Sequence, residues 1–265
     1  MTKPVTTTKE LNNGVSMPVI GLGTYQLSDT AVESAVESAL SAGYRRIDTA
    51  KFYQNEREIG DAIKASGIPR KEIFITTKLW PTNFINAEWA LEESLDKLQT
   101  DYVDLYLIHW PFVGKMRAWK ALEACYADGR IRAIGVSNYS TKNVDDLLKS
   151  SQIMPAINQV EFSPFFYKKD LLNHCAAKGI TLEAYSPLTR GKKLHDPIIT
   201  AVAEQYGKSP SQIMIRWALE HGLTAVPKAS SPEHIAENIN VFDFSISPDD
   251  MAALDALNNN FRAGF

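Results

Sequence analysis

Asp48, Lys78 and His109 stand at the ends of three successive apolar runs, and Tyr53 follows Asp48 in a short polar connection. These residue types suit proton transfer to a carbonyl group. A free tyrosine has a pKa of about 10, which is too high for efficient proton transfer at neutral pH. A neighbouring lysine cation would lower that pKa, and Asp48 would keep the lysine charged. His109 could hydrogen-bond a substrate carbonyl oxygen, so the set predicts a site that polarises and protonates a carbonyl.

Each of these side chains alone also fits an ordinary structural role. An aspartate after a strand often forms a turn, and a lysine at a strand end often reaches solvent. Their coincidence at three successive strand ends favours the chemical interpretation. The sequence contains no G-x-S-x-G elbow and no His/Cys cluster with metal spacing. It therefore predicts neither a serine nucleophile nor a metal site.

The elements that would position these residues alternate along the whole chain. Helix-period segments such as 29–43 and 86–100 separate short β-rich runs that are apolar on both faces, as buried parallel strands are. Eight such units predict a single α/β domain over residues 1–265, a closed (β/α)8 TIM barrel, with an open doubly wound sheet as the alternative. The expected strands are 17–23, 44–50, 73–79, 103–110, 131–137, 156–162, 180–187 and 223–229.

The segment "LNNGV" at 11–15 predicts a tight N-terminal β-hairpin, because Asn-Gly favours a type I′ turn. We expect this hairpin to close the bottom of the barrel. Trp89, Trp119 and Trp217 lie on helical patterns and are expected to pack between helices and barrel. The charged stretch 56–64 is interpreted as a solvated helix face, and Lys51 as a solvated side chain at the rim.

Composition indicates a soluble globular protein. The net charge of -3, from 28 basic and 31 acidic residues, predicts no bulk attraction to nucleic acid or to an anionic membrane. The two cysteines, Cys125 and Cys175, are interpreted as buried thiols in a reducing cytosol. The N-terminus has no apolar signal-peptide core, and no long uncharged run predicts a membrane span. We therefore expect a cytoplasmic protein, and a monomer.

Long motifs along nearly the whole chain resemble those of the aldo-keto reductases, and most of all the bacterial branch that includes 2,5-diketo-D-gluconate reductases and morphine-dehydrogenase-like members. The motifs are "GYRRIDTAKFYQNEREIG" (43–60), "ITTKLW" (75–80), "DYVDLYLIHWP" (101–111), "IRAIGVSNYS" (131–140), "PAINQVEFSP" (155–164), "YSPL" (185–188) and "VPKASSPEHIAEN" (226–238).

The resemblance implies a catalytic tetrad of Asp48, Tyr53, Lys78 and His109 and a nicotinamide cofactor bound without a Rossmann fold. Consistently, "GLGTYQ" (21–26) lacks the last glycine of a complete dinucleotide fingerprint. The substrate pocket is expected to contain Tyr25, Trp80, His109 and Trp110. The cofactor positions implied by the family are Thr24, Asp48, Ser137, Asn138, Gln159, Tyr185, Ser186, Leu188, Lys228, Ser230, Ser231, His234, Glu237 and Asn238.

The family pattern also assigns these cofactor positions to parts of the molecule. Ser137, Asn138 and Gln159 would hold the carboxamide, and Tyr185 would stack on the nicotinamide. The pyrophosphate would pass Ser186 and Leu188. Lys228 and Ser230 would approach the adenosine phosphate, with Glu237 and Asn238 beside the adenine.

The sequence departs from the family pattern in two regions, the motif at the adenosine end and the end of the chain. His234 stands where an arginine is usual, and Ser231 replaces a second basic residue of some relatives. Because an arginine fork suits a 2′-phosphate better than a neutral histidine, we expect NADPH as cofactor but a smaller disadvantage for NADH than is typical. The chain also stops at Phe265, and the link 111–119 is short, which predicts an open site with broad substrate acceptance.

The sequence as a whole predicts an NADPH-dependent reductase of small-molecule carbonyls: small aldehydes, α-keto carbonyls or keto-sugar derivatives. Two other functions remain open at this level. One is a barrel aldolase that forms a Schiff base on Lys78. The other is a cofactor-binding regulatory subunit on the same barrel, since a fold does not determine a function.

Overall fold

Eight parallel strands form a barrel in the computed structural model, which describes residues 7–264. The strands lie in sequence order, and bridges from Ile20 to Ala225 and from Gly23 to Lys228 join the first barrel strand to the last. The predicted (β/α)8 fold is thus confirmed. The barrel strands are β3 (Leu22–Gly23), β4 (Arg46–Asp48), β5 (Phe74–Leu79), β6 (Leu105–Ile108), β7 (Ile134–Ser137), β8 (Ile157–Glu161), β9 (Thr181–Tyr185) and β10 (Thr224–Val226).

Glycine allows the closing contact of the barrel. A Cβ atom at Gly23 would lie 2.7 Å from the carbonyl oxygen of Val226. Any larger residue would therefore push β3 away from the segment that follows β10.

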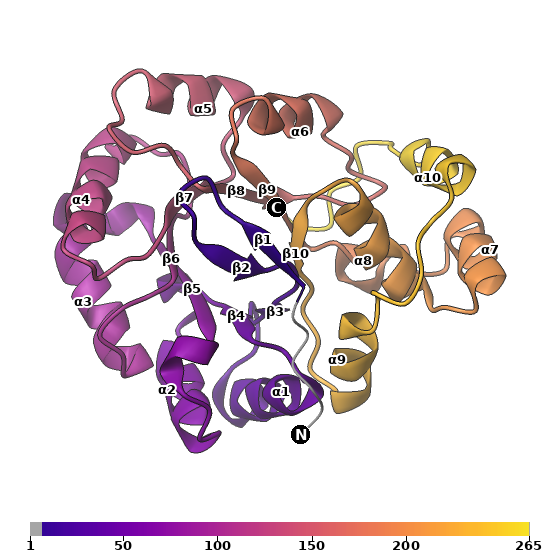
Figure 1. Ribbon diagram of the computed structural model, residues 1–265, viewed down its shortest axis with the longest axis horizontal. Helices are drawn as coiled ribbons and strands as arrows, with labels where there is room; N and C mark the ends of the chain where they lie inside the picture. The colour runs from indigo at the N-terminus through magenta and orange to yellow at the C-terminus, as the bar shows by residue number, and fades with distance from the viewer. Residues whose placement is uncertain (1–6, 265) are drawn as a thin grey trace.

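A ring of helices surrounds the barrel (Figure 1). Ser140 and Ser209 begin two of them with reciprocal capping boxes. The helices are α1 (Asp29–Ala42), α2 (Glu56–Ala65), α3 (Ala87–Leu98), α4 (Lys115–Ala127), α5 (Thr141–Leu148), α6 (Lys169–Ala176), α7 (Pro197–Tyr206), α8 (Pro210–Glu220), α9 (Pro232–Ile239) and α10 (Pro248–Asp255). Short 3₁₀ turns are η1 (Lys51–Tyr53), η2 (Arg70–Glu72), η3 (Pro81–Asn86) and η4 (Thr189–Gly191). No helix within residues 7–264 is long and apolar enough to cross a membrane.

The N-terminal hairpin of β1 (Thr8–Glu10) and β2 (Ser16–Pro18) lies across one end of the barrel (Figure 1). Its Leu11 and Met17 are buried against residues that begin the barrel strands, such as Phe74 and Leu105. The hairpin therefore closes the bottom as predicted, but the expected strand 17–23 is divided between hairpin and barrel.

The turn of this hairpin differs from the predicted type I′. The amide of Gly14 donates to the carbonyl of Leu11, which makes Asn12 and Asn13 the central residues. A type I′ turn needs positive φ at both central residues, whereas here the positive φ of 82° belongs to Gly14. The side chains of both asparagines donate instead to carbonyls of the barrel bottom, those of Pro155 and Arg132.

Three predictions about individual side chains are wrong. Trp119 and Trp217 are buried as expected, but Trp89 is 56% exposed. The ammonium group of Lys51 lies 5.0 Å from the centre of the Trp89 ring and pairs with Glu93, which leaves its side chain only 15% exposed. These contacts attach η1 to α3.

Glu56 is the third exception, because it is buried although it belongs to the charged stretch 56–64. It accepts a hydrogen bond of 2.6 Å from the Thr77 hydroxyl on β5, and burial raises the pKa of its carboxyl. The inward face of α2 covers this strand, so a charge that the sequence pattern assigns to solvent lies in the interior.

Both cysteines are free and buried, as predicted. Burial raises the pKa of the Cys125 and Cys175 thiols to about 11, so neither is a reactive thiolate at neutral pH.

Candidate active site

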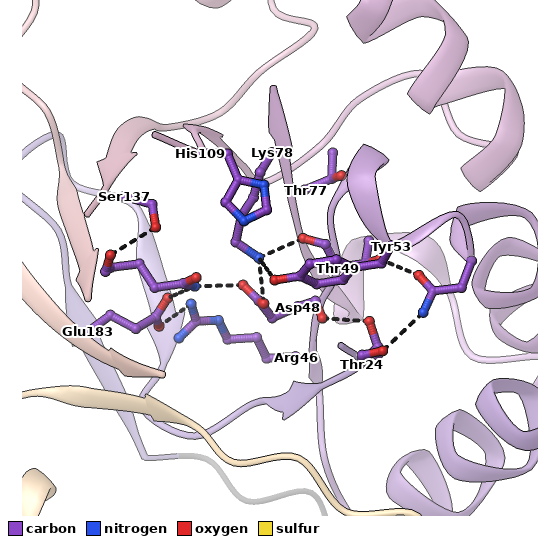
Figure 2. Close-up of polar contacts among 12 residues, drawn as sticks. Thr24, Arg46, Asp48, Thr49, Tyr53, Thr77, Lys78, His109, Ser137 and Glu183 are labelled. Atoms are coloured by element: carbon purple, nitrogen blue, oxygen red, sulfur yellow. Dashed lines mark hydrogen bonds and ion pairs between the residues drawn. The ribbon is translucent and has the colours of Figure 1, made fainter. Parts of the chain in front are cut away.

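The four predicted catalytic residues meet at the carboxyl end of the barrel (Figure 2). Lys78 on β5 donates to Asp48 Oδ1 at 2.6 Å and to the carbonyl of Thr49 at 2.7 Å. Its third contact is longer, 3.5 Å from Nζ to the Tyr53 hydroxyl. An ammonium group has three hydrogens, so these contacts account for its full donor capacity. Because Lys78 donates to the oxygen of Tyr53, the tyrosine keeps its own proton for another acceptor.

Asn55 holds the loop that carries Tyr53, although the sequence analysis did not identify it. Its amide nitrogen donates to the carbonyls of Thr24 at 3.0 Å and Leu27 at 2.8 Å, and its oxygen accepts from Thr49 at 2.7 Å. The residue is buried directly before α2. A polar residue at that place predicts a helix cap, and only the folded chain reveals that it connects two loops, the one between β3 and α1 and the one between β4 and α2.

The proton affinities of Tyr53 and His109 both favour the neutral forms. Burial raises the pKa of Tyr53 well above its usual value, and the negative charge of Asp48 and nearby Tyr25 raise it further. The net effect is a raised pKa, so the sequence-based expectation of a lowered pKa for Tyr53 is wrong for this structure. Burial lowers the pKa of His109 well below its usual value, with a smaller effect from the Lys78 cation.

These directions predict a flat pH profile for a reaction in which Tyr53 is the acid. Protonated Tyr53 and neutral His109 coexist from about pH 6.5 to about pH 9.5, between their two shifted pKa values. We expect kcat for carbonyl reduction to vary less than about twofold over this range in steady-state assays. A tyrosine pKa lowered by Lys78 would instead make kcat fall as the pH rises through neutrality.

The predicted nicotinamide-side residues lie next to this group. Tyr185 donates from its hydroxyl to Asn138 Oδ1 at 2.9 Å, and Asn138 Nδ2 donates to the His109 carbonyl at 3.1 Å. Ser137 donates to the backbone carbonyl of Gln159 at 2.9 Å. Asn138 has a φ of 63°, a left-handed conformation that asparagine tolerates better than most residues. The ends of β7, β8 and β9 are thereby connected beside the tetrad.

A cleft of about 560 Å³ connects the tetrad with the N-terminal end of α9, a volume typical of ligand sites. Aromatic rings line the substrate end, where Trp80 stacks on Phe52 at 4.0 Å and lies edge-on to His109 at 5.2 Å. Phe52 and Arg190 line the cleft without having been predicted as site residues. The predicted residues that line it are Thr24, Tyr25, Asp48, Tyr53, Trp80, His109, Trp110, Ser137, Asn138, Gln159, Tyr185, Ser186, Leu188, Lys228, Ser230, His234 and Asn238.

Three predicted site residues lie outside the lining of this cleft. Lys78 is fully buried behind Asp48 and Tyr53. Ser231 is the N-cap of α9 and accepts from the His234 amide at 3.2 Å. Glu237 accepts a hydrogen bond from Ser209 at the start of α8.

Residues 19–259 match the sequence pattern described as the aldo/keto reductase family. The chain belongs to this family. Among curated aldo-keto reductase relatives, glyoxal reductase of Bacillus subtilis (strain 168) is 46% identical, over 97% of this chain and 95% of its own. Morphine 6-dehydrogenase of Pseudomonas putida is 44% identical, over 96% of this chain and 92% of its own.

Solved structures of aldo-keto reductases share the fold. The Brucella melitensis aldo/keto reductase superposes with a TM-score of 0.93 at 42% identity, over 96% of this chain and all of its own. A Bombyx mori aldo-keto reductase in complex with NADP has the same TM-score at 35% identity, over 100% of this chain and 96% of its own. This aldo-keto reductase is therefore an oxidoreductase of a family that acts on small carbonyl substrates with nicotinamide cofactors.

The contacts of Lys78 argue against the aldolase alternative. A Schiff base needs a neutral amine that can reach the substrate. Lys78 is completely buried, and its amine is turned to Asp48, Thr49 and the Tyr53 hydroxyl and does not line the cleft. Within residues 7–264, no cluster of His, Cys, Asp and Glu could hold a metal ion.

Proposed function

We propose that this protein reduces aldehydes and ketones to alcohols with NADPH, and that Tyr53 is the general acid. The observation that carries the proposal is the Tyr53 hydroxyl, which accepts from Lys78 and shares one cleft with His109. The bound cofactor supplies hydride to the carbonyl carbon. Tyr53 donates its proton to the carbonyl oxygen, and the adjacent Lys78 cation stabilises the phenolate that remains.

His109 orients the substrate in this mechanism. Its ring lies edge-on to Tyr53 with 5.7 Å between centroids, so one carbonyl oxygen can approach both groups. His109 Nδ1 is buried and has no hydrogen-bond partner among the described residues. We therefore place the proton of the neutral imidazole on Nε2, from which it donates to the substrate oxygen. Asp48 holds the Lys78 ammonium group in place through their ion pair.

The donor and acceptor set fits a nicotinamide cofactor. The oxygen of Gln159 is available at the cleft, because its amide nitrogen already donates to Asp48 at 2.7 Å. Asn138 and Tyr185 lie beside it and would hold the nicotinamide. At the opposite end, Lys228 offers a cation to a phosphate, with Ser230 and His234 next to it.

The residues at the adenosine end of the cleft predict the preference for NADPH over NADH. Lys228 is the lysine that lines this end, and His234 is a weaker partner for a 2′-phosphate than an arginine. We expect Lys228→Ala to lower kcat/KM for NADPH by about 10-fold or more, with less than about twofold change for NADH. His234→Arg should raise the NADPH/NADH ratio of kcat/KM. Equal losses for both cofactors in Lys228→Ala would contradict this assignment.

The aromatic end of the cleft supports small aldehydes, α-keto carbonyls and keto-sugar derivatives as substrates. Tyr25, Trp80 and Trp110 offer flat apolar walls, and His109 is the polar group among them. The name of the relative glyoxal reductase supports small dicarbonyl compounds as substrates. A panel of carbonyls that includes methylglyoxal, assayed by NADPH oxidation, tests the proposal. Turnover of several members is expected, and the absence of turnover with every member would overturn it.

A further inference from the structure

A second buried ion pair lies next to the pair of Asp48 and Lys78. Arg46 on β4 pairs with Glu183 on β9, and both side chains are completely inaccessible to solvent. Arg46 also donates to the carbonyl of Pro18 at 3.3 Å, and Thr224 donates to Glu183 Oε2 at 2.9 Å. Figure 2 shows this pair beside Asp48. The catalytic site therefore rests on a second layer of charge inside the barrel.

Gln159 connects the two ion pairs. Its Nε2 atom lies 2.7 Å from Asp48 Oδ2 and 2.7 Å from Glu183 Oε1. Each carboxylate is ion-paired with its own cation and can only accept hydrogen bonds. Chemistry alone thus requires the nitrogen of Gln159, and not its oxygen, to face both carboxylates. Both amide hydrogens are used, and the acceptor Oε1 is the group left for a ligand.

The ion pair itself is a poor explanation for stability. Burying two charges costs desolvation energy, and well-packed apolar residues of similar size are often at least as stabilising. Glu183 supplies a hydrogen-bond acceptor for Gln159, which apolar residues would lack. With Asp48 as the other acceptor, it immobilises the Gln159 amide from both sides.

We propose that Glu183 is a positioning residue, which Arg46 and Thr224 hold in place so that Gln159 presents its carbonyl oxygen to the cleft. The oxygen would accept a hydrogen bond from the carboxamide NH₂ of the nicotinamide ring. This inference rests on the proposed function. It assigns to Glu183 a part in selecting a carboxamide over an isosteric group without N–H donors.

Two double variants distinguish a role of Glu183 in positioning Gln159 from a role in filling the barrel interior. Arg46→Met/Glu183→Gln removes both charges but keeps a carbonyl acceptor for Gln159. Arg46→Met/Glu183→Met removes both charges and the acceptor. The probes are NADPH and its 3-acetylpyridine analogue, which lacks the carboxamide NH₂. Dissociation constants are measured by quenching of protein fluorescence, with adenosine 2′,5′-bisphosphate as a probe of the other end of the cleft and circular dichroism as a check of folding.

We expect the wild-type protein to bind NADPH about 10-fold more tightly than the analogue, as one well-aligned hydrogen bond allows. The double variant with Glu183→Gln should keep most of this ratio. The double variant with Glu183→Met should lose it, through weaker NADPH binding and unchanged binding of the analogue and of the bisphosphate. Equal ratios in the two double variants would overturn the role of Glu183. A wild-type protein that does not bind NADPH would instead refute the proposed function.

Discussion

Tyr53→Phe is expected to lower kcat for carbonyl reduction by about 10²–10⁴-fold, the usual contribution of a positioned general acid. The variant keeps the ring and its contacts, including the 5.0 Å packing against Tyr25, and removes the proton that the carbonyl oxygen would receive. The Kd of NADPH should change less than about threefold, because within residues 7–264 the contact of the hydroxyl is the long one with Lys78. Steady-state kinetics and cofactor fluorescence measure the two effects separately.

Tyr139→Phe is the matched control. Tyr139 is also buried near the carboxyl end of the barrel, and its hydroxyl has no hydrogen-bond partner among residues 7–264. Removing the Tyr139 hydroxyl should leave kcat within about twofold of the wild-type value, since no proton transfer is assigned to this group. A Tyr53→Phe enzyme with an unchanged kcat would refute Tyr53 as the proton donor.

Lys78→Met is expected to damage both folding and catalysis. It leaves the carboxylate of Asp48 buried without its cation, and breaking a buried ion pair on one side costs about 3–5 kcal/mol of unfolding free energy. For a domain of this size, such a loss lowers Tm by about 10 °C. Reduction should also fall steeply, because the phenolate formed at Tyr53 loses the adjacent cation. Thermal unfolding and kinetic assays of the same preparation provide both quantities.

The double variant Asp48→Asn/Lys78→Met distinguishes these two losses. With both charges removed, no unpaired carboxylate remains, so much of the lost stability should return. Activity should stay low, since neither charge is present to support Tyr53. The control is the single variant Asp48→Asn. If the double variant loses as much unfolding free energy as Asp48→Asn and Lys78→Met lose together, the two charges are not energetically coupled.

The sequence was sufficient to predict the barrel and the rim at which Asp48, Tyr53, Lys78 and His109 meet. Buried parallel strands are apolar on both faces, so the point where each run stops locates its carboxyl end. Asp48, Lys78 and His109 stand at such points, and all parallel strands of a barrel end on one side. The Asn-Gly pair at 13–14 predicted the hairpin at the barrel bottom, and helical periodicity predicted the packing of Trp119 and Trp217.

Some local details required the folded chain. The predicted type I′ turn of the hairpin was wrong because Asn12 and Asn13 direct their side chains to the barrel bottom. Lys51 and Glu56 were assigned to solvent because periodicity shows which face of a helix is apolar, not which neighbour covers a particular charge. The expected cofactor residues were implied by the family resemblance and by no pattern of their own.

The direction of the Tyr53 pKa could not be predicted from the neighbouring residue types. A lysine cation and an aspartate carboxylate shift a neighbouring tyrosine pKa in opposite directions. Burial, the largest cause of the raised pKa of Tyr53, exists only in the folded chain. Likewise, Arg46, Gln159 and Glu183 come from three separate strands and show no local pattern. Local sequence determines where a strand ends and which residue type ends it. Only barrel closure, which sets the strands against one another, determines which of these side chains share a proton, a charge or a hydrogen bond.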